Sequence, residues 1–159
     1  DNILKESQRI LKKPNGLFSV IGYATPIYPQ NTSFQNEFKH YYMNILNSHD
    51  YGKDICYWDI DRKMLDFAYN NVNFNQYFTD IEKSWFMEQK FLNETELFGY
   101  FKTMTGYQNY INKHSNDADF VDPLLKLRDV YQTELTQTKQ SSIMVGIPFF
   151  ALQMVPKNS

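Results

Sequence analysis

An apolar run of eight residues, Leu17 to Ala24, constrains the fold of this chain more than any other feature. Ser19 is its polar member, and a Pro-Asn-Gly turn precedes it. Continuous rather than alternating hydrophobicity predicts a strand covered on both faces, as in the parallel sheet of an α/β protein. The chain leaves the run through Tyr23, Thr25 and Tyr28. Because ligands of open α/β sheets bind beyond the carboxyl ends of the strands, these three residues are predicted to line a pocket.

Composition and charge exclude several classes of protein. The 159 residues carry a net charge of −2 and a pI near 5.9, so we predict no broad cationic surface and no nucleic-acid partner. The longest apolar run, Ile143 to Leu152, is far shorter than a spanning helix, which predicts no membrane partner. The single cysteine, Cys56, cannot form an internal disulfide and is compatible with a reducing compartment. We therefore expect a soluble, cytoplasmic protein.

Hydrophobic spacing and capping residues divide the rest of the chain into elements. After a first helix that ends before the turn, the pattern predicts helices near 33–47, 62–70, 94–113 and 123–135, and strands near 76–88 and 143–155. Thr32 or Ser33 is expected to cap the second helix. Asn93 and Asp122 are expected to cap two of the later helices. Pro148 is expected to bulge the final strand or end its pairing.

The helix, turn and strand around residues 11–16 resemble a segment of the class I S-adenosylmethionine-dependent methyltransferases. In that family a helix closes with LKPGG and enters the fifth strand of the sheet, where this chain has LKKPNG. Tyr57, Trp58 and Arg62 match an aromatic pair and an arginine before a short lid helix in the fungal trans-aconitate methyltransferase-like branch. Residues 100–107, YFKTMTGY, resemble the family's YLRTWSAY. The resemblance implies an α/β fold: the C-terminal portion of a Rossmann-like methyltransferase sheet, its last three strands, with a helical lid over the acceptor pocket.

The resemblance assigns the whole chain, 1–159, to the C-terminal part of one methyltransferase domain. Its sheet portion would be 1–28, 72–92 and 139–157, and its helical acceptor-pocket portion 29–71 and 93–138. The chain begins directly in a helical pattern, which supports its being part of something longer. An exposed sheet edge, left where further strands would pair, would allow self-association.

By resemblance, the parent protein transfers a methyl group from S-adenosylmethionine to a small-molecule acceptor, for which a carboxylate such as trans-aconitate is one candidate. The family binds the cofactor on a glycine-rich turn, where backbone can approach a ligand closely. The six glycines of this chain never cluster, so cofactor-binding residues are expected upstream of Asp1 and this span alone is expected to be inactive. A carboxylate is already ionised near pH 7, so we predict no catalytic base. The three histidines lack a metal-ligand spacing, so no metal site is predicted.

The residues predicted to bind the acceptor are Tyr23, Thr25, Tyr28, Tyr57, Trp58 and Arg62. Arg62 is the strongest candidate, because the arginine fork can grip a carboxylate with two hydrogen bonds. A surface ion pair with Asp59 or Asp66 is the open alternative for Arg62. Packing under the lid is the alternative for Tyr28, and packing in the core is the alternative for Trp58.

Two other functions compete with the enzyme. The first is a non-catalytic methyltransferase-like binding or regulatory module, which the missing glycine-rich turn favours. Met104, standing where the family motif has a tryptophan, favours it as well. The second is an aromatic-rich binder of single-stranded nucleic acid, which requires a positively charged groove that the charge balance does not supply. A glycine-rich strand-turn-helix upstream of Asp1 would favour the enzyme.

Overall fold

The computed structural model describes residues 2–12, 15–46, 56–58 and 62–157. The chain divides into two compact units. We call the first the sheet unit; it comprises Asp1–Pro26, Arg62–Glu88 and Ile147–Ser159. We call the second the helical unit; it comprises Ile27–Asp61 and Gln89–Gly146. The assignment of both units to one methyltransferase domain stays a prediction.

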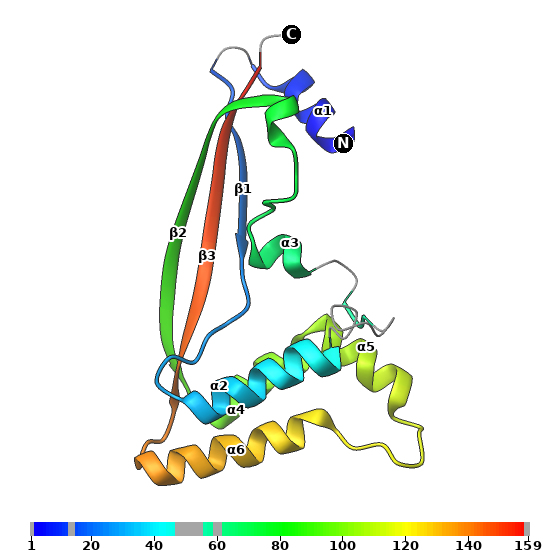
Figure 1. The fold of residues 1–159 in the computed structure, drawn as a ribbon, viewed down its shortest axis with the longest axis vertical. Helices are drawn as coiled ribbons and strands as arrows, with labels where there is room; N and C mark the ends of the chain where they lie inside the picture. The colour runs from blue at the N-terminus through cyan, green and yellow to red at the C-terminus, as the bar shows by residue number, and fades with distance from the viewer. Residues whose placement is uncertain (1, 13–14, 47–55, 59–61, 158–159) are drawn as a thin grey trace. The chain divides into compact units, whose positions relative to one another are not determined.

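The strands of the chain form a three-stranded sheet in the order β1-β3-β2 (Figure 1). The strands are β1 (Phe18–Tyr23), β2 (Phe78–Leu92) and β3 (Ile143–Pro156). β1 pairs antiparallel with β3, from Phe18 opposite Met154 to Tyr23 opposite Phe149. The ribbon in Figure 1 shows that β3 also runs opposite to β2. The strand expected at the apolar run is therefore present, but its partner in the described chain is antiparallel.

The expectation that the first strand is covered on both faces is wrong for the described chain. Burial alternates along β1, with Phe18 and Val20 half-buried and Ile21 72% exposed. Successive side chains of a strand point to opposite faces, so one face of β1 meets the core and the other meets solvent. The ring of Phe18 stacks on that of Phe78 at 5.0 Å, which places the covered face against the core of the sheet unit.

The core of the sheet unit lies under the chain that joins α3 (Arg62–Asp66) to β2. Its buried residues are Ala68, Phe74, Phe78, Phe150, Leu152 and Met154. The helix predicted to reach Asn70 ends at Asp66, because Ala68 and Tyr69 take left-handed backbone angles, with φ of 47° and 56°. A 3-10 turn, Phe74–Gln76, then leads into β2. α1 (Asn2–Ile10) belongs to the same unit and has no buried residue.

The predicted end of pairing at Pro148 is confirmed, although the strand itself is continuous: the ladder between β1 and β3 stops with Tyr23 opposite Phe149. β3 runs unbroken from Ile143 to Pro156. The carbonyl of Pro148 accepts a hydrogen bond from the backbone N–H of Ala24 at 2.8 Å. Proline lacks an N–H and cannot donate to a neighbouring strand, and the register of β3 with β1 stops one residue from it, at Phe149.

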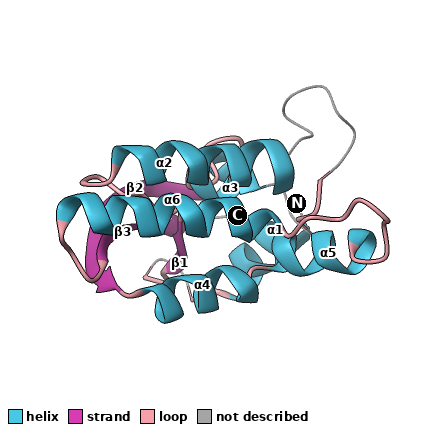
Figure 2. Cartoon of the chain, turned by 90° about the horizontal axis from the view of Figure 1, so that it is seen from below, coloured by secondary structure: helices cyan, strands magenta, loops and turns pink. Residues whose placement is uncertain are grey.

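The helical unit is built on α2 (Thr32–Lys39), which continues as a π-helical segment, His40–Leu46. α2 lies alongside α6 (Pro123–Thr138) (Figure 2). The predicted cap of α2 is wrong: its N-cap is Asn31, and the Asn31 side chain makes no capping bond. Instead, Glu134 of α6 accepts a hydrogen bond from the N–H of Phe34 at 2.8 Å. Acceptor and helix end come from different segments, so sequence spacing did not reveal this contact.

The helix predicted over 94–113 is two helices, α4 (Glu94–Thr103) and α5 (Thr105–His114). They separate at Met104, whose backbone is extended with φ −65° and ψ 126°. The predicted caps are confirmed: Asn93 forms a reciprocal capping box with Glu96, and Asp122 accepts from the N–H of Leu124 at 2.9 Å. None of the described helices is both long enough and apolar enough to cross a bilayer.

Candidate functional site

Three of the predicted acceptor residues gather in the sheet unit, where the chain leaves β1. Tyr23 ends the strand and is 44% exposed. Two residues on, Thr25 is held by Asp66 of α3, whose Oδ1 accepts hydrogen bonds from both the N–H and the hydroxyl of Thr25 at 2.8 Å. Arg62 is the first residue of α3, and Asp66 is its last. We call Tyr23, Thr25, Arg62 and Asp66 the β1-end cluster.

Arg62 is the cation of the β1-end cluster. Its Nη2 lies 3.8 Å from Asp66 Oδ1, and its guanidinium carbon lies 5.8 Å from the centre of the Tyr23 ring. Arg62 is only 7% exposed, so its pair with Asp66 is not the surface ion pair considered from the sequence. A separation of 3.8 Å is an electrostatic contact without a hydrogen bond. Asp59, the other partner considered, lies outside the described residues.

The β1-end cluster can orient a negatively charged group. A buried guanidinium beside an aromatic face is a suitable donor to a carboxylate. Asp66 fixes the backbone of Thr25, because one oxygen accepts from both donors of that residue. The cluster combines the cation of Arg62 and the phenol of Tyr23 with the carboxylate of Asp66, which already accepts from the Thr25 hydroxyl.

The other three predicted residues, Tyr28, Tyr57 and Trp58, lie in the helical unit. Tyr28 is 1% exposed, and its ring makes edge contacts with Phe34 at 4.8 Å and Phe38 at 4.9 Å. Among the described residues its hydroxyl has no hydrogen-bond partner, and burial raises its pKa well above the usual value. These contacts fit the packing alternative for Tyr28. A role in acceptor binding stays a prediction.

Trp58 packs inside the helical unit. Its indole lies 5.5 Å from the ring of Tyr42. On another side it approaches Gly106 so closely that an added Cβ would lie 2.7 Å from Trp58 Cε2. The core-packing alternative accounts for these contacts, and a role as a pocket wall stays a prediction.

Tyr57 belongs to a hydrogen-bonded relay that sequence reasoning missed. Its hydroxyl lies 2.5 Å from His114 Nε2, and His114 Nδ1 lies 2.7 Å from Asp117 Oδ2. Asp117 favours a proton on Nδ1 of His114, so Nε2 can accept a hydrogen bond from the Tyr57 hydroxyl. Burial raises the pKa of Tyr57, and Tyr110 and Asp117 add to the effect. The i,i+3 spacing of His114 and Asp117 was the available signal, but Tyr57 is 57 residues away.

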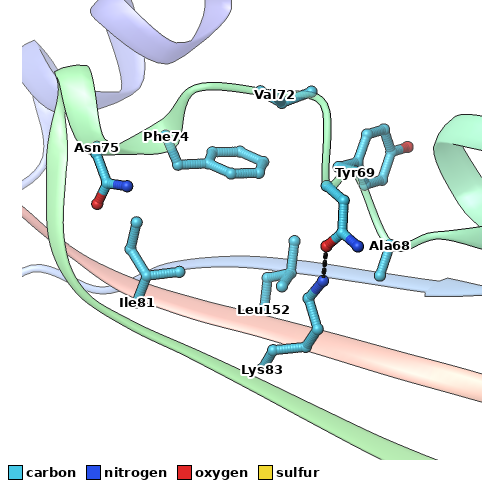
Figure 3. A pocket seen from close by; sticks show the side chains of 9 residues that line it. Ala68, Tyr69, Val72, Phe74, Asn75, Ile81, Lys83 and Leu152 are labelled. Atoms are coloured by element: carbon cyan, nitrogen blue, oxygen red, sulfur yellow. Dashed lines mark hydrogen bonds between the residues drawn. The ribbon is translucent and has the colours of Figure 1, made fainter.

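A small cavity lies in the sheet unit between the chain at 68–75 and the sheet (Figure 3). We call it the loop cavity; its volume is about 210 Å³. Its lining residues are Ala68, Tyr69, Asn70, Val72, Phe74, Asn75, Ile81, Lys83 and Leu152. Figure 3 shows Phe74 and Val72 on the loop side, Ile81 and Leu152 on the sheet side, and Lys83 reaching the loop at Asn70. No pattern in the sequence predicted this cavity.

Three of the described glycines lie close to other atoms of the chain. A side chain at Gly16 would collide with the backbone carbonyl of Lys12. Gly22 and Gly106 also stand where a side chain would collide, and there the colliding groups are rings of the protein itself: Phe150 against Gly22 and Trp58 against Gly106. Their missing side chains therefore make room for core packing and not for a ligand. Within the described part of the chain, no group of three or more His, Cys, Asp or Glu side chains is placed to hold a metal ion.

Comparison with known proteins identifies the fold. No protein-family model matches the chain, and no curated protein matches it. A solved structure described as a "Putative Type II Methyltransferase" from Anaeromyxobacter dehalogenans matches with a TM-score of 0.70 at 15% sequence identity. The match covers 98% of this chain and 58% of the other, so this chain spans little more than half the length of that protein. The chain therefore has a methyltransferase-like fold.

Proposed function

We propose that this chain is part of a S-adenosylmethionine-dependent methyltransferase that acts on a small-molecule acceptor. The observation that carries the proposal is the likeness, over nearly the whole chain, to the fold of a protein described as a methyltransferase. The strand order supports it, because an antiparallel β3 between β1 and β2 suits the last three strands of a Rossmann-like methyltransferase sheet. On this proposal residues 29–71 and 93–138 supply the acceptor pocket and its lid.

The acceptor we propose is a small carboxylate, with trans-aconitate as a candidate. The β1-end cluster supports this choice, because Arg62 brings a buried positive charge within 5.8 Å of the centre of the Tyr23 ring. An ionised carboxylate needs no general base before it is methylated. The residues of this chain would then bind the acceptor, orient it and exclude water. Acceptor binding by Tyr28, Tyr57 and Trp58 of the helical unit stays a prediction from the sequence.

The cofactor is proposed to bind mainly to residues outside this chain. Beside Gly22 and Gly106, the space that a side chain would occupy is taken by the rings of Phe150 and Trp58. A cytoplasmic location, the absence of nucleic-acid and membrane partners, and self-association through the edge of β1 stay predictions.

Substitution of Arg62 tests the acceptor site. In the full-length protein, Arg62→Ala should raise the KM for trans-aconitate by about 10- to 100-fold, because a charged hydrogen bond to a carboxylate contributes about 1.5–3 kcal/mol. The matched control is Arg9→Ala, since Arg9 is exposed and pairs with Glu6 at 2.6 Å in α1. Steady-state kinetics measure KM, and circular dichroism verifies folding. A folded Arg62→Ala protein with unchanged KM would remove Arg62 from the site.

Cofactor binding separates the enzyme from the alternative function. The full-length protein should bind S-adenosylmethionine saturably by calorimetry, whereas residues 1–159 alone should not. A full-length protein that binds no cofactor would overturn the methyltransferase proposal. It would favour a non-catalytic methyltransferase-like module, for which the lack of a glycine-rich turn in this sequence is the supporting observation.

A further inference from the structure

We propose that the loop cavity binds a small amphipathic carboxylate, such as a short-chain fatty acid. This proposal does not depend on the methyltransferase function. All nine lining residues belong to the sheet unit, and none of them belongs to the β1-end cluster. The loop cavity therefore shares no residue with the β1-end cluster, where the acceptor is proposed to bind.

The inner part of the loop cavity is apolar. Leu152 and Phe74 are members of the buried core, at 2% and 9% exposure, and Ile81 packs against that core. Figure 3 shows the Phe74 ring on one side of the cavity, with Ile81 and Leu152 on the other. Transfer of a short alkyl chain from water to such a surface is favourable by about 25 cal/mol for each Å² that it buries. The volume of about 210 Å³ limits the ligand to a short chain.

One edge of the loop cavity carries a positive charge. The ammonium of Lys83 donates a hydrogen bond to the side-chain oxygen of Asn70, which is a neutral acceptor. No ion pair joins Lys83 to a carboxylate within the described residues. An ammonium has three donors, so the contact with Asn70 leaves others for a bound oxygen. A cation beside an apolar cavity matches a ligand with one anionic end and one apolar end.

The loop that covers the cavity is held in shape by its own backbone. The N–H of Ala68 donates to Leu65 at 3.0 Å, and that of Val72 donates to Tyr69 at 2.9 Å. The Tyr69 ring makes an edge contact with Phe150 of β3 at 5.9 Å, which attaches the loop to the sheet. A cavity formed before the ligand arrives lowers the entropic cost of binding. The left-handed angles at Ala68 and Tyr69 are of the kind that clusters at ligand sites.

Two probes that share a six-carbon chain test the proposal: hexanoate, which carries the charge, and 1-hexanol, which does not. NMR titration of the 159-residue chain should show saturable hexanoate binding with a Kd on the order of 1 mM, with shifts at loop-cavity residues. Lys83→Met keeps the aliphatic stem and removes the charge. It should weaken hexanoate binding by about tenfold and leave hexanol binding unchanged. Lys90→Met, at the other lysine of β2, should change neither.

A second variant blocks the apolar part of the cavity. Ile81→Phe should abolish the binding of both probes, with circular dichroism showing that the protein stays folded. Three results would overturn the proposal. They are a wild-type chain that shows no saturable hexanoate binding, a Lys83→Met chain that binds hexanoate as tightly as wild type, and a folded Ile81→Phe chain that still binds both probes.

Discussion

Gly106 is a residue whose side chain could not be larger without moving its neighbour. It lies in α5 against the indole of Trp58, and a Cβ at this position would come 2.7 Å from Trp58 Cε2 and 2.9 Å from Cδ2. Gly99 in α4 is the opposite case, because a Cβ there would meet nothing within 4 Å. Packing against Trp58 therefore requires glycine at position 106, whereas position 99 has room for a larger side chain.

We predict that Gly106→Ala and Gly99→Ala change stability in opposite directions. Gly106→Ala should lower the free energy of unfolding by about 1–3 kcal/mol, because the indole has to shift within a packed region. Gly99→Ala should raise it by up to about 1 kcal/mol, because alanine favours an exposed helix position. Urea unfolding followed by circular dichroism measures both. Equal effects in the two variants would show that Trp58 does not pack against α5 as described.

At the scale of elements, the start of α2 depends on a side chain from a different helix. Glu134 of α6 is 9% exposed, and its Oε2 accepts from the N–H of Phe34 in the first turn of α2. The N-cap residue, Asn31, makes no side-chain capping bond, so this contact from α6 satisfies a donor that the local sequence does not. A negative charge at this position also opposes the positive end of the α2 dipole.

Removing that acceptor should destabilise the helical unit. Glu134→Ala should cost about 1–3 kcal/mol, because a buried N–H loses its partner. Glu134→Gln keeps an acceptor and loses the charge, so it should cost less, about 0.3–1 kcal/mol. Thr32→Ala and Ser33→Ala, at the caps expected from the sequence, should be close to neutral. Chemical denaturation of the four variants gives the comparison, and a large loss at Thr32 or Ser33 would contradict the contact between α6 and α2.

At the scale of the whole molecule, buried phenols make stability depend on alkaline pH. Burial, with Asp122 contributing next, raises the pKa of Tyr107 to about 12. Burial, with Glu94 contributing next, raises the pKa of Tyr131 to about 12 as well. An unfolded tyrosine titrates near pH 10, so the folded state holds these protons more tightly. Their contribution to stability is complete below about pH 10 and is lost as the pH rises toward 12.

The urea midpoint of the chain should therefore fall between about pH 10 and pH 12. Tyr131→Phe should flatten this fall, because it removes one of the titrating hydroxyls while losing only a long contact of 3.5 Å to the Leu92 carbonyl. Circular dichroism at a series of pH values provides the measurement. A midpoint that stays constant up to pH 12 in the wild-type chain would show that these phenols are not buried in the folded state.

Local features of the sequence were sufficient for most elements and their caps. The box of Asn93 with Glu96, and the cap at Asp122, depend on residues two or three positions apart, so their geometry follows from helix formation alone. The break at Met104 did not follow from helical spacing, because the apolar stripe continues through it. The burial of the two faces of β1 could not be predicted either. A continuous apolar run shows that the side chains are hydrophobic, but it does not show what packs against each face of the strand.

The candidate sites divide in the same way. Sequence order already placed Tyr23 and Thr25 at the end of a strand, and a family resemblance added Arg62. The tertiary structure decided that Asp66 joins Thr25 to α3, that His114 meets Tyr57, and that a cavity forms beside Lys83. Each of these contacts joins segments separated by more than ten residues. Contacts between residues that are close in sequence can therefore be predicted from the sequence, because helix geometry alone brings them together. Contacts between distant segments form only when the chain has folded.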